Sequence, residues 1–242
     1  MSLAATKKSL RQYYRQLRNQ LSIKQKKSAA QSVAHLFLKN ILPHKKNRGF
    51  LKLVLSSLRV LEAIYLHFIF SDGLPRSTRN DVPCGTFRKS FNIAVYLAHD
   101  GEIDLQYLIE KLWQTECAVF LPVVHADTQQ LCFVRYRAST TMKKNQYGIQ
   151  EPENMTEFIL PEALDIVLMP LVAFDHNGAR LGMGKGYYDK SFAFCRYPHI
   201  KPMLVGVAYQ CQYCEMLPVD EWDVPLDGIM TEKKLILLNE NL

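Results

Sequence analysis

The sequence predicts an α/β protein, and three observations lead to this fold class. Apolar residues recur at helical spacing in residues 6–42, and short runs of strand-forming residues then alternate with helix-compatible segments. One of these runs is followed by a glycine-rich loop and a further helix-compatible segment, an order typical of α/β folds. The 242 residues suit one α/β domain or two small ones, and a hydrophobic content of 48% is ample for a packed core.

The bulk properties narrow the choice of partner and compartment. A net charge of +7 fits an anionic ligand such as a nucleotide or a polyglutamyl tail, and it fits nucleic acid equally well. We expect neither a signal peptide nor a membrane span, because no apolar run has the required position or length. The six cysteines show no regular spacing, and reduced thiols of a cytoplasmic protein are the simplest interpretation.

The N-terminal region predicts two helices within residues 6–42. In the first helix the apolar stripe consists of Leu10, Tyr14, Leu17 and Leu21. A neighbouring face carries Lys7, Arg11 and Arg18, and taken alone such a basic face is most simply solvated. Ser22 is expected to cap the second helix, at 23–42.

Residues 49–90 differ from the rest of the chain. Charged residues interrupt the apolar residues of 50–70, which favours an amphipathic helix. The stretch 71–90 is polar and contains prolines and several basic residues, a composition typical of a loop or of disorder.

Strands and one further helix are predicted after residue 90. The predicted strands are 92–97, 118–124, 131–135, 166–169, 203–208, 229–231 and 235–238. Polar and aromatic residues interleave in 131–135, which favours an edge position. Asp104 is expected to cap a helix at 105–115.

The most informative stretch is the glycine-rich segment after the strand at 166–169. It contains Gly178, Gly182, Gly184 and Gly186, and a helix-compatible segment follows at 190–196. The order of strand, glycine-rich loop and helix presents backbone N–H groups to an anion, usually a phosphate. The spacing fits neither a Walker A loop nor GxGxxG, and the glycines alone indicate a plain structural turn equally well.

The whole string FDxxGxRLGxGxGYYD, from Phe174 to Asp189, resembles the signature of the 5-formyltetrahydrofolate cyclo-ligases, also called methenyltetrahydrofolate synthetases. Further segments extend the resemblance over 6–42 and 91–238. It implies a three-layer α/β sandwich with a mostly parallel sheet and N-terminal helices. We therefore expect a single cyclo-ligase-like domain over 1–242, with an atypical insertion at about 49–90. The insertion could be an oligomer contact or a nucleic-acid patch, but a dispensable surface excursion is the simplest interpretation.

The resemblance also implies an ATP site with Mg²⁺. Lys7 and Arg11 match a basic pair on the family's first helix that contacts the nucleotide phosphates. The rest of the ATP site is the segment Arg180, Leu181, Gly182, Met183, Gly184, Lys185, Gly186 and Tyr187. Within it, Lys185 and Arg180 are the expected catalytic cations. Asp189 and Asp223 are the expected magnesium ligands, a chemically suitable choice because Mg²⁺ takes few protein carboxylates.

Three residues are implied to bind the folate. Glu102 lies in HDGEID, which resembles a family segment whose glutamate contacts the pterin; taken alone, it would be an exposed loop acid. Tyr147 lies in YGI followed by Glu-Pro, which resembles a loop that lines the folate pocket. Tyr188 is placed to stack on the folate or to hydrogen-bond with it.

The implied activity is the ATP-dependent closure of 5-formyltetrahydrofolate to 5,10-methenyltetrahydrofolate, with release of ADP and phosphate. The partner is then a folate, with or without a polyglutamyl tail, and we expect a monomer with no membrane or nucleic-acid partner. Two alternatives stay open. A sugar-phosphate isomerase or CoA-transferase relative would ignore ATP, and a nucleic-acid-binding protein would lose affinity steeply with salt.

Overall fold

The computed structural model describes residues 3–42, 91–125, 128–145, 148–196 and 202–238. The expected insertion at 49–90, with its amphipathic helix and polar loop, lies outside these residues. The same is true of Tyr147.

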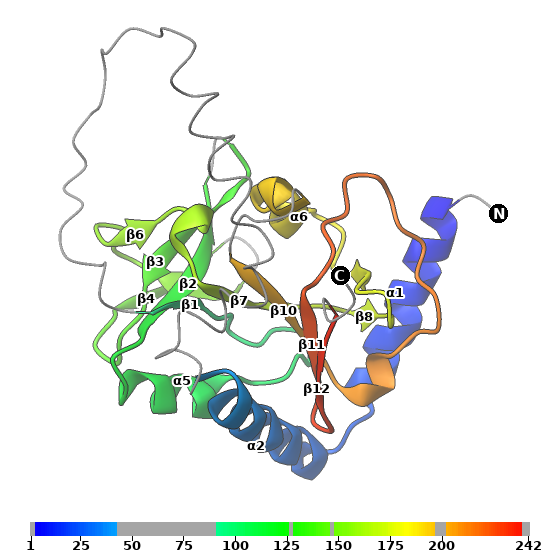
Figure 1. Cartoon of the computed structure of the whole chain (residues 1–242), viewed down its shortest axis with the longest axis horizontal. Helices are drawn as coiled ribbons and strands as arrows, with labels where there is room; N and C mark the ends of the chain where they lie inside the picture. The colour runs from blue at the N-terminus through cyan, green and yellow to red at the C-terminus, as the bar shows by residue number, and fades with distance from the viewer. Residues whose placement is uncertain (1–2, 43–90, 126–127, 146–147, 197–201, 239–242) are drawn as a thin grey trace, which may run out of the picture.

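A mostly parallel sheet forms the middle of the molecule (Figure 1). Within the described residues it has eight strands in the order β12-β11-β10-β7-β1-β2-β3-β6. The strands are β1 (Asn92–Ala94), β2 (Ala118–Val124), β3 (Leu131–Arg135), β6 (Phe158–Ile159), β7 (Ile166–Pro170), β10 (Met203–Val207), β11 (Gly228–Met230) and β12 (Leu235–Leu237). The strands from β11 to β2 pair in parallel, and β12, β3 and β6 add antiparallel pairs at the two sides.

The expected edge position of residues 131–135 is wrong. The two-residue strand β6 pairs with β3 and forms the edge instead. Four of the five residues of β3 are buried, so its polar and aromatic residues do not mark a solvated side. A partner as short as β6 leaves no periodicity in the sequence from which it could be predicted.

Helices cover both faces of the sheet and give the expected three layers. The helices are α1 (Leu3–Asn19), α2 (Ile23–Asn40), α5 (Gln106–Trp113) and α6 (Tyr187–Ser191), with 3-10 turns η4 (Pro161–Ala163), η5 (Ala193–Arg196) and η6 (Gln210–Gln212). In Figure 1, α2 and α5 lie below the sheet and α6 lies above it. Strand β7 alternates between the two cores: Ile166 and Leu168 pack with α2 and α5, whereas Val167 and Met169 share the opposite core with Phe192.

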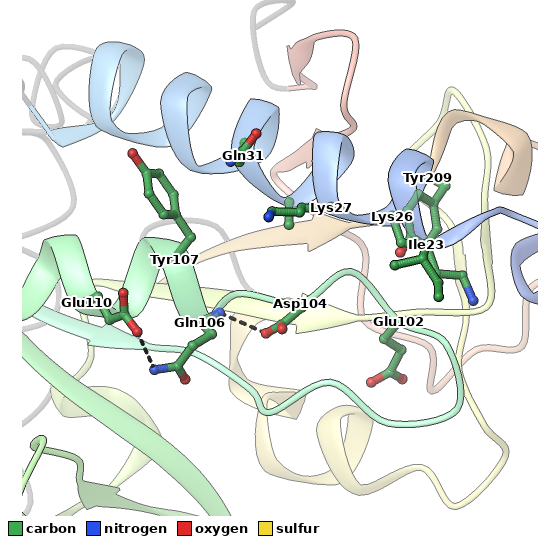
Figure 2. Close-up of a pocket in the computed structure, with 11 residues that line it drawn as sticks. Ile23, Lys26, Lys27, Gln31, Glu102, Asp104, Gln106, Tyr107, Glu110 and Tyr209 are labelled. Atoms are coloured by element: carbon green, nitrogen blue, oxygen red, sulfur yellow. Dashed lines mark hydrogen bonds between the residues drawn. The ribbon is translucent and has the colours of Figure 1, made fainter.

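Local capping follows the sequence. The Ser22 side chain accepts a hydrogen bond from Gln25 N–H, and the Gln25 side chain accepts one from Ser22 N–H, a capping box. The Asp104 carboxylate accepts a hydrogen bond of 2.9 Å from Gln106 N–H, at the first residue of α5 (Figure 2). The cap expected at Ser22 is confirmed. The N-cap of α5 is Leu105 rather than Asp104 and carries no side-chain cap; Asp104 lies one residue earlier and contacts only the N–H group of Gln106.

Two small ribbons stand outside the main sheet. Strands β4 (Met142–Lys144) and β5 (Gln150–Pro152) form one of them, and β8 (Ala173–Phe174) and β9 (Arg180–Leu181) form the other. The β8–β9 ribbon lies inside the segment predicted as a glycine-rich loop. Asp175 closes it, because its buried carboxylate accepts hydrogen bonds from the N–H groups of Asn177 and Ala179.

The helix after the glycine-rich loop starts earlier than predicted. The pattern indicated a helix at 190–196, whereas α6 begins at Tyr187 and gives way to η5 at Ala193. Gly186 precedes α6 in the left-handed region, with φ 67°, so the loop turns directly into the helix.

No helix in the described part of the chain has the length and apolar character needed to cross a membrane.

Candidate active site

Three loops that follow neighbouring parallel strands carry the predicted site residues. Glu102 follows β1, the glycine-rich segment follows β7, and Asp223 follows β10. Strands β1 and β10 both pair in parallel with β7, so these three loops leave the same edge of the sheet. Ligands of open α/β sheets bind at this edge, outside the carboxyl ends of the strands.

Helix α1 brings two cations to this edge; Figure 1 shows the helix beside β8. Lys7 Nζ lies 2.7 Å from Asp220 Oδ2 and 2.9 Å from Asp223 Oδ2, and 11% of its side chain is exposed. Burial alone lowers the pKa of Lys7, but the hydrogen bonds and charges of Asp220 and Asp223 outweigh it and raise the pKa. The ammonium group is therefore charged at neutral pH and bridges both carboxylates.

Arg11 connects α1 to the glycine-rich loop. Its Nε donates a hydrogen bond of 2.8 Å to the Gly182 carbonyl. Its guanidinium also lies close to Gly184, since a Cβ at that position would be 3.5 Å from the Arg11 Cζ atom. Gly184 has φ 99°, a conformation that other residues rarely adopt, and the space beside Gly182 and Gly186 is open. The loop thus leaves free volume next to a fixed positive charge.

Arg180 and Lys185 occupy different environments. Arg180 is nearly buried, with 5% of its side chain exposed; it pairs with Asp189 Oδ1 at 2.5 Å and donates a further hydrogen bond to the Val224 carbonyl. Burial lowers the pKa of Arg180, and the charge of Asp189 opposes this shift. Lys185 is exposed and makes no hydrogen bond or ion pair within the described residues. Lys185 is therefore available to an incoming anion, whereas Arg180 already joins β9, α6 and the Asp223 loop.

In the part of the chain that the structure describes, Asp189 and Asp223 each leave one carboxylate oxygen for a possible magnesium ion. Asp189 Oδ1 accepts from Arg180 and from Val224 N–H, and Asp223 Oδ2 accepts from Lys7 and from Asp220 N–H. The second oxygen of each carboxylate accepts no hydrogen bond from the described residues. Those residues contain no cluster of three or more His, Cys, Asp or Glu side chains suited to a metal ion. The pair fits Mg²⁺ if phosphate and water oxygens complete the coordination.

The turn that carries Glu102 is tightly built. Asp100 and Gly101 both have positive φ, 51° and 79°, and His99 N–H donates a hydrogen bond of 3.1 Å to Glu102 Oε2. Burial raises the pKa of Glu102 to about 7, and the hydrogen bond from His99 and the charge of Arg18 oppose the shift only in part. The expectation from sequence alone, an exposed loop acid, is wrong because Glu102 is partly buried.

Glu102 and Tyr188 lie near enough to interact electrostatically, although Glu102 lies in the loop after β1 and Tyr188 lies in α6. Burial raises the pKa of Tyr188, and the charge of Glu102 raises it further. Glu102 also contributes to the wall of a cavity of about 480 Å³ between α2, α5 and its own loop. In Figure 2 its carboxylate points away from Lys26 and Lys27, which line the same cavity from α2. The carboxylate of Glu102 is therefore not directed at the basic residues of α2.

Two residues at this edge were missed or misjudged from the sequence. Asp220 was given no role, yet it shares Lys7 with Asp223. Arg18 was grouped with a solvated basic face, whereas its side chain is fully buried. The solvated interpretation of that face is wrong for both Lys7 and Arg18. The seven-residue spacing from Arg11 to Arg18 placed them on one face of α1 but could not show what covers that face.

The fold and the site together define a class. This is a mostly parallel α/β protein in which a glycine-rich loop, a basic N-terminal helix and two carboxylates meet at the carboxyl ends of the strands.

Comparison with known proteins narrows this class to a family. The family model described as the 5-formyltetrahydrofolate cyclo-ligase family matches residues 82–232. The chain therefore belongs to the 5-formyltetrahydrofolate cyclo-ligase family, whose members are enzymes.

Individual relatives agree with the family match. The chain is 48% identical over 145 residues to the 5-formyltetrahydrofolate cyclo-ligase of Haemophilus influenzae, covering 59% of this chain and 76% of the relative. It is 43% identical over 145 residues to that of Escherichia coli K12, covering 59% and 79%. The solved 5,10-methenyltetrahydrofolate synthetase of Aquifex aeolicus superimposes with a TM-score of 0.68 and 27% identity, covering 98% of this chain and 94% of that one.

Proposed function

We propose that this chain catalyses the ATP-dependent cyclisation of 5-formyltetrahydrofolate to 5,10-methenyltetrahydrofolate, with release of ADP and phosphate. Membership of the family supports the proposal. The observation that carries it is the contact of α1 with two loops at once: Lys7 binds Asp223 while Arg11 binds the backbone of Gly182. This gathers cations, carboxylates and open backbone groups around one volume, as the binding of a nucleotide requires.

The reaction needs a group that makes the formyl oxygen leave. That oxygen is a poor leaving group until the terminal phosphate of ATP is transferred to it. N10 of the folate then attacks the formyl carbon, the C–O bond breaks, and phosphate leaves with its bonding electrons. Such chemistry depends on positioning and on neutralising charge around the phosphoryl group, and it requires no protein nucleophile.

The residues of the glycine-rich loop take the phosphate in this proposal. Lys185 is the cation that meets the transferring phosphoryl group, because it is exposed and carries no competing contact within the described residues. The segment from Leu181 to Tyr187, including Met183, supplies backbone N–H groups. Arg180 keeps Asp189 in place through their 2.5 Å ion pair, and Lys7 and Arg11 close the site from α1.

Mg²⁺ would be held by Asp189 and Asp223, together with phosphate oxygens and water. When bound, it would neutralise part of the charge that develops on the phosphates. Arg180 and Lys7, which already neutralise these two carboxylates, would limit how strongly they attract a cation before the nucleotide arrives.

Glu102 recognises the pterin in this proposal. An ionised carboxylate can accept paired hydrogen bonds from the N–H groups of the aminopyrimidine edge. The charge of Glu102 raises the pKa of Tyr188, so the two side chains are close, and we assign Tyr188 to the same ring system. Tyr147 is proposed for the same pocket from the sequence resemblance alone. We further propose that the chain acts as a cytoplasmic single-domain monomer, on folates with or without a polyglutamyl tail.

The proposal is tested by mixing the full chain with 5-formyltetrahydrofolate, ATP and Mg²⁺. A near-ultraviolet absorbance band of methenyltetrahydrofolate should grow, and it should not grow when ATP is omitted. A protein that is folded by circular dichroism yet gives no band would contradict the proposal. An isomerase or CoA-transferase relative would instead turn over its own substrates without ATP.

A further inference from the structure

Arg18 is a fully buried cation of α1, and each of its three guanidinium nitrogens donates a hydrogen bond to one of two loops, the Asp100 turn or the segment after β7. Nε donates to the Asp100 carbonyl at 2.9 Å, and Nη2 donates to Asp100 Oδ2 at 2.8 Å. Nη1 donates to the Leu171 carbonyl at 3.1 Å. A guanidinium without solvent is costly unless such partners satisfy it, so this geometry is strongly specified.

Nε and Nη2 of Arg18 contact Asp100, in the turn that precedes Glu102. Asp100 is in the left-handed region with φ 51°, and Gly101 follows with φ 79°. A Cβ at Gly101 would lie 2.1 Å from Asn19 Oδ1, so the turn is pressed against the end of α1. Hydrogen bonds from Arg15 and Arg18 lower the pKa of Asp100, which keeps this carboxylate ionised at neutral pH.

Nη1 of Arg18 contacts the Leu171 carbonyl, at the start of the segment that leads to the glycine-rich loop. Leu171 follows β7, and the N–H group of the next residue, Val172, donates a 2.7 Å hydrogen bond to the Leu181 carbonyl. Leu181 is the last residue of β9 and leads directly into Gly182. The Gln212 side chain, from the loop after β10, also donates to the Leu171 carbonyl at 2.9 Å. Arg18 thus joins the Glu102 turn to the starting point of the loop.

We propose that Arg18 is a positioning residue for the cyclisation. It fixes the Glu102 turn relative to the glycine-rich loop, and so holds the formyl oxygen of the folate at the right distance from the terminal phosphate of ATP. The inference rests on the proposed function and deepens it. Reacting atoms must be held within about 3–3.5 Å, and a displacement of about 1 Å costs on the order of a hundredfold in rate.

Arg15 provides a matched control. Its Nε lies 2.6 Å from the same Asp100 Oδ2 atom, so both arginines neutralise one carboxylate. The Arg15 side chain is 45% exposed, however, and among its contacts in the described residues none reaches Leu171. Of these two arginines, Arg18 alone contacts both Asp100 and Leu171 in the part of the chain that the structure describes. Arg15→Met therefore removes one of the two cations beside Asp100 but keeps the hydrogen bonds of Arg18 to Asp100 and Leu171.

The test compares Arg18→Met, Arg18→Lys and Arg15→Met in the full chain. We expect kcat to fall about a hundredfold in both Arg18 variants, because neither side chain reproduces three fixed donors. Arg15→Met should stay within about twofold, as exposed substitutions usually do. Equilibrium binding of 5-formyltetrahydrofolate should tighten in the presence of a non-hydrolysable ATP analogue in the wild type, and this tightening should be lost in both Arg18 variants.

A pH profile of folate binding distinguishes the two effects of Arg18: its hydrogen bonds to Asp100 and Leu171, and its positive charge near Glu102. Glu102 accepts a hydrogen bond from His99 N–H and interacts electrostatically with Asp100, Arg18, Tyr96 and Tyr188. The charged residues that line its cavity from α2 and around α5 are Lys26, Lys27, Asp104 and Glu110. The charge of Arg18 opposes the raised pKa of Glu102, so its removal raises that pKa further. Folate binding that needs ionised Glu102 should shift to higher pH in Arg18→Met, which loses the charge, but not in Arg18→Lys, which keeps it. A fall in kcat in Arg18→Lys without a shift in the profile therefore reports the lost contacts, and a merely structural role would leave the kcat of the folded Arg18→Lys variant unchanged.

A second variant covers the case in which the Arg18 variants do not fold. Asp100→Asn keeps a side chain that tolerates the left-handed turn and accepts a hydrogen bond, but it removes the charge. We expect a fall in kcat of about tenfold there. Folded Arg18 variants, or failing them Asp100→Asn, with wild-type kcat and intact tightening would overturn the inference. A wild type that neither binds 5-formyltetrahydrofolate nor turns it over would contradict the proposed function itself.

Discussion

Lys185 and Arg180 belong to one motif but lie in different environments, so the proposed function gives them different tasks. Arg180 precedes Gly182 and Lys185 lies between Gly184 and Gly186, and the family resemblance implies a catalytic role for both. In the structure Arg180 is held by Asp189 and by the Val224 carbonyl, whereas Lys185 faces solvent. The exposed lysine can approach an anion without breaking a protein contact in the described residues. The buried arginine is committed to Asp189, so in the proposed site it would act by orienting that carboxylate.

The first prediction concerns Lys185→Ala. Loss of a cation at the transferring phosphoryl group should lower kcat by about a hundredfold or more, as removal of one transition-state contact does. The melting temperature should stay unchanged, because the side chain is exposed. Lys190→Ala is the control: Lys190 is also exposed, but it contacts Gln129 rather than the loop. Equal rates for Lys185→Ala and wild type would remove Lys185 from the site.

The second prediction concerns Glu102 and pH. Its carboxyl has a pKa raised to about 7 from 4.5, so the native state retains a proton that the unfolded chain has lost. Stability should therefore fall as pH rises from 4.5 towards 7, by at most about 3 kcal/mol and by less where water reaches the carboxyl. Glu102→Gln should remove this fall. Denaturant unfolding at pH 4 and pH 8 measures it: the variant should match wild type at pH 4 and exceed it at pH 8.

The same substitution should act oppositely on function. Glu102→Gln cannot accept two hydrogen bonds from the pterin edge in the same way as a carboxylate, so folate affinity should drop by about tenfold or more. A variant that is no more stable than wild type at pH 8, or that binds folate equally well, would contradict the placement of Glu102.

At the scale of elements, α1 connects the loops of the site. Its residues Lys7 and Arg11 contact the Asp223 loop and the glycine-rich loop, and Arg18 contacts the Glu102 turn. No strand of the sheet performs this task, since each loop leaves a different strand. In the proposed site, α1 therefore positions the loops and does not only cover the core.

The third prediction follows from Lys7. In Lys7→Met two partly buried carboxylates, Asp220 and Asp223, lose their shared cation and repel each other. The KM for ATP should rise by about tenfold or more, because the Asp223 loop and the phosphates both lose a partner. The KM for folate should change little. Lys8→Met, at an exposed neighbouring position, is the control, and an unaltered KM for ATP would show that α1 does not reach the nucleotide.

The sequence predicts the positions of the longer strands and helices well, but it does not predict which side chains contact one another. Strands β2 and β3 have their predicted bounds, because long apolar runs identify buried strands well. The β8–β9 ribbon was not predicted, because strands of two residues leave no pattern. The burial of Arg18 was also missed, since Asp100 and Leu171, which receive it, lie far along the chain. Periodicity reports which residues share a face, but tertiary contacts decide what that face meets.

At the scale of the whole molecule, the order of the strands creates the site. Strands β1, β7 and β10 are neighbours in the sheet although helices and loops separate them in sequence. The motifs of the three loops were recognised one by one through their resemblance to the family. Their convergence follows only from the parallel pairing, which no single motif contains.

The fourth prediction concerns the segment 49–90, which we propose to be an insertion in one domain. Replacing it by a short Gly/Ser linker should leave kcat within about threefold, because long surface connections change stability little. The matched measurement is turnover of the full chain under the same conditions. A large loss of activity in a folded deletion variant would show that the segment serves the site. A large gain would show that it restrains the site.

The most direct measurement of the central claim follows both products in one reaction. ADP release and methenyltetrahydrofolate absorbance are recorded together after ATP, Mg²⁺ and 5-formyltetrahydrofolate are added to the full chain. Phosphoryl transfer coupled to ring closure predicts that the two products appear at the same rate and in equal amounts. Cyclisation without ADP release, or ADP release at a rate that does not depend on 5-formyltetrahydrofolate, would contradict the claim that a nucleotide and a pterin share this site.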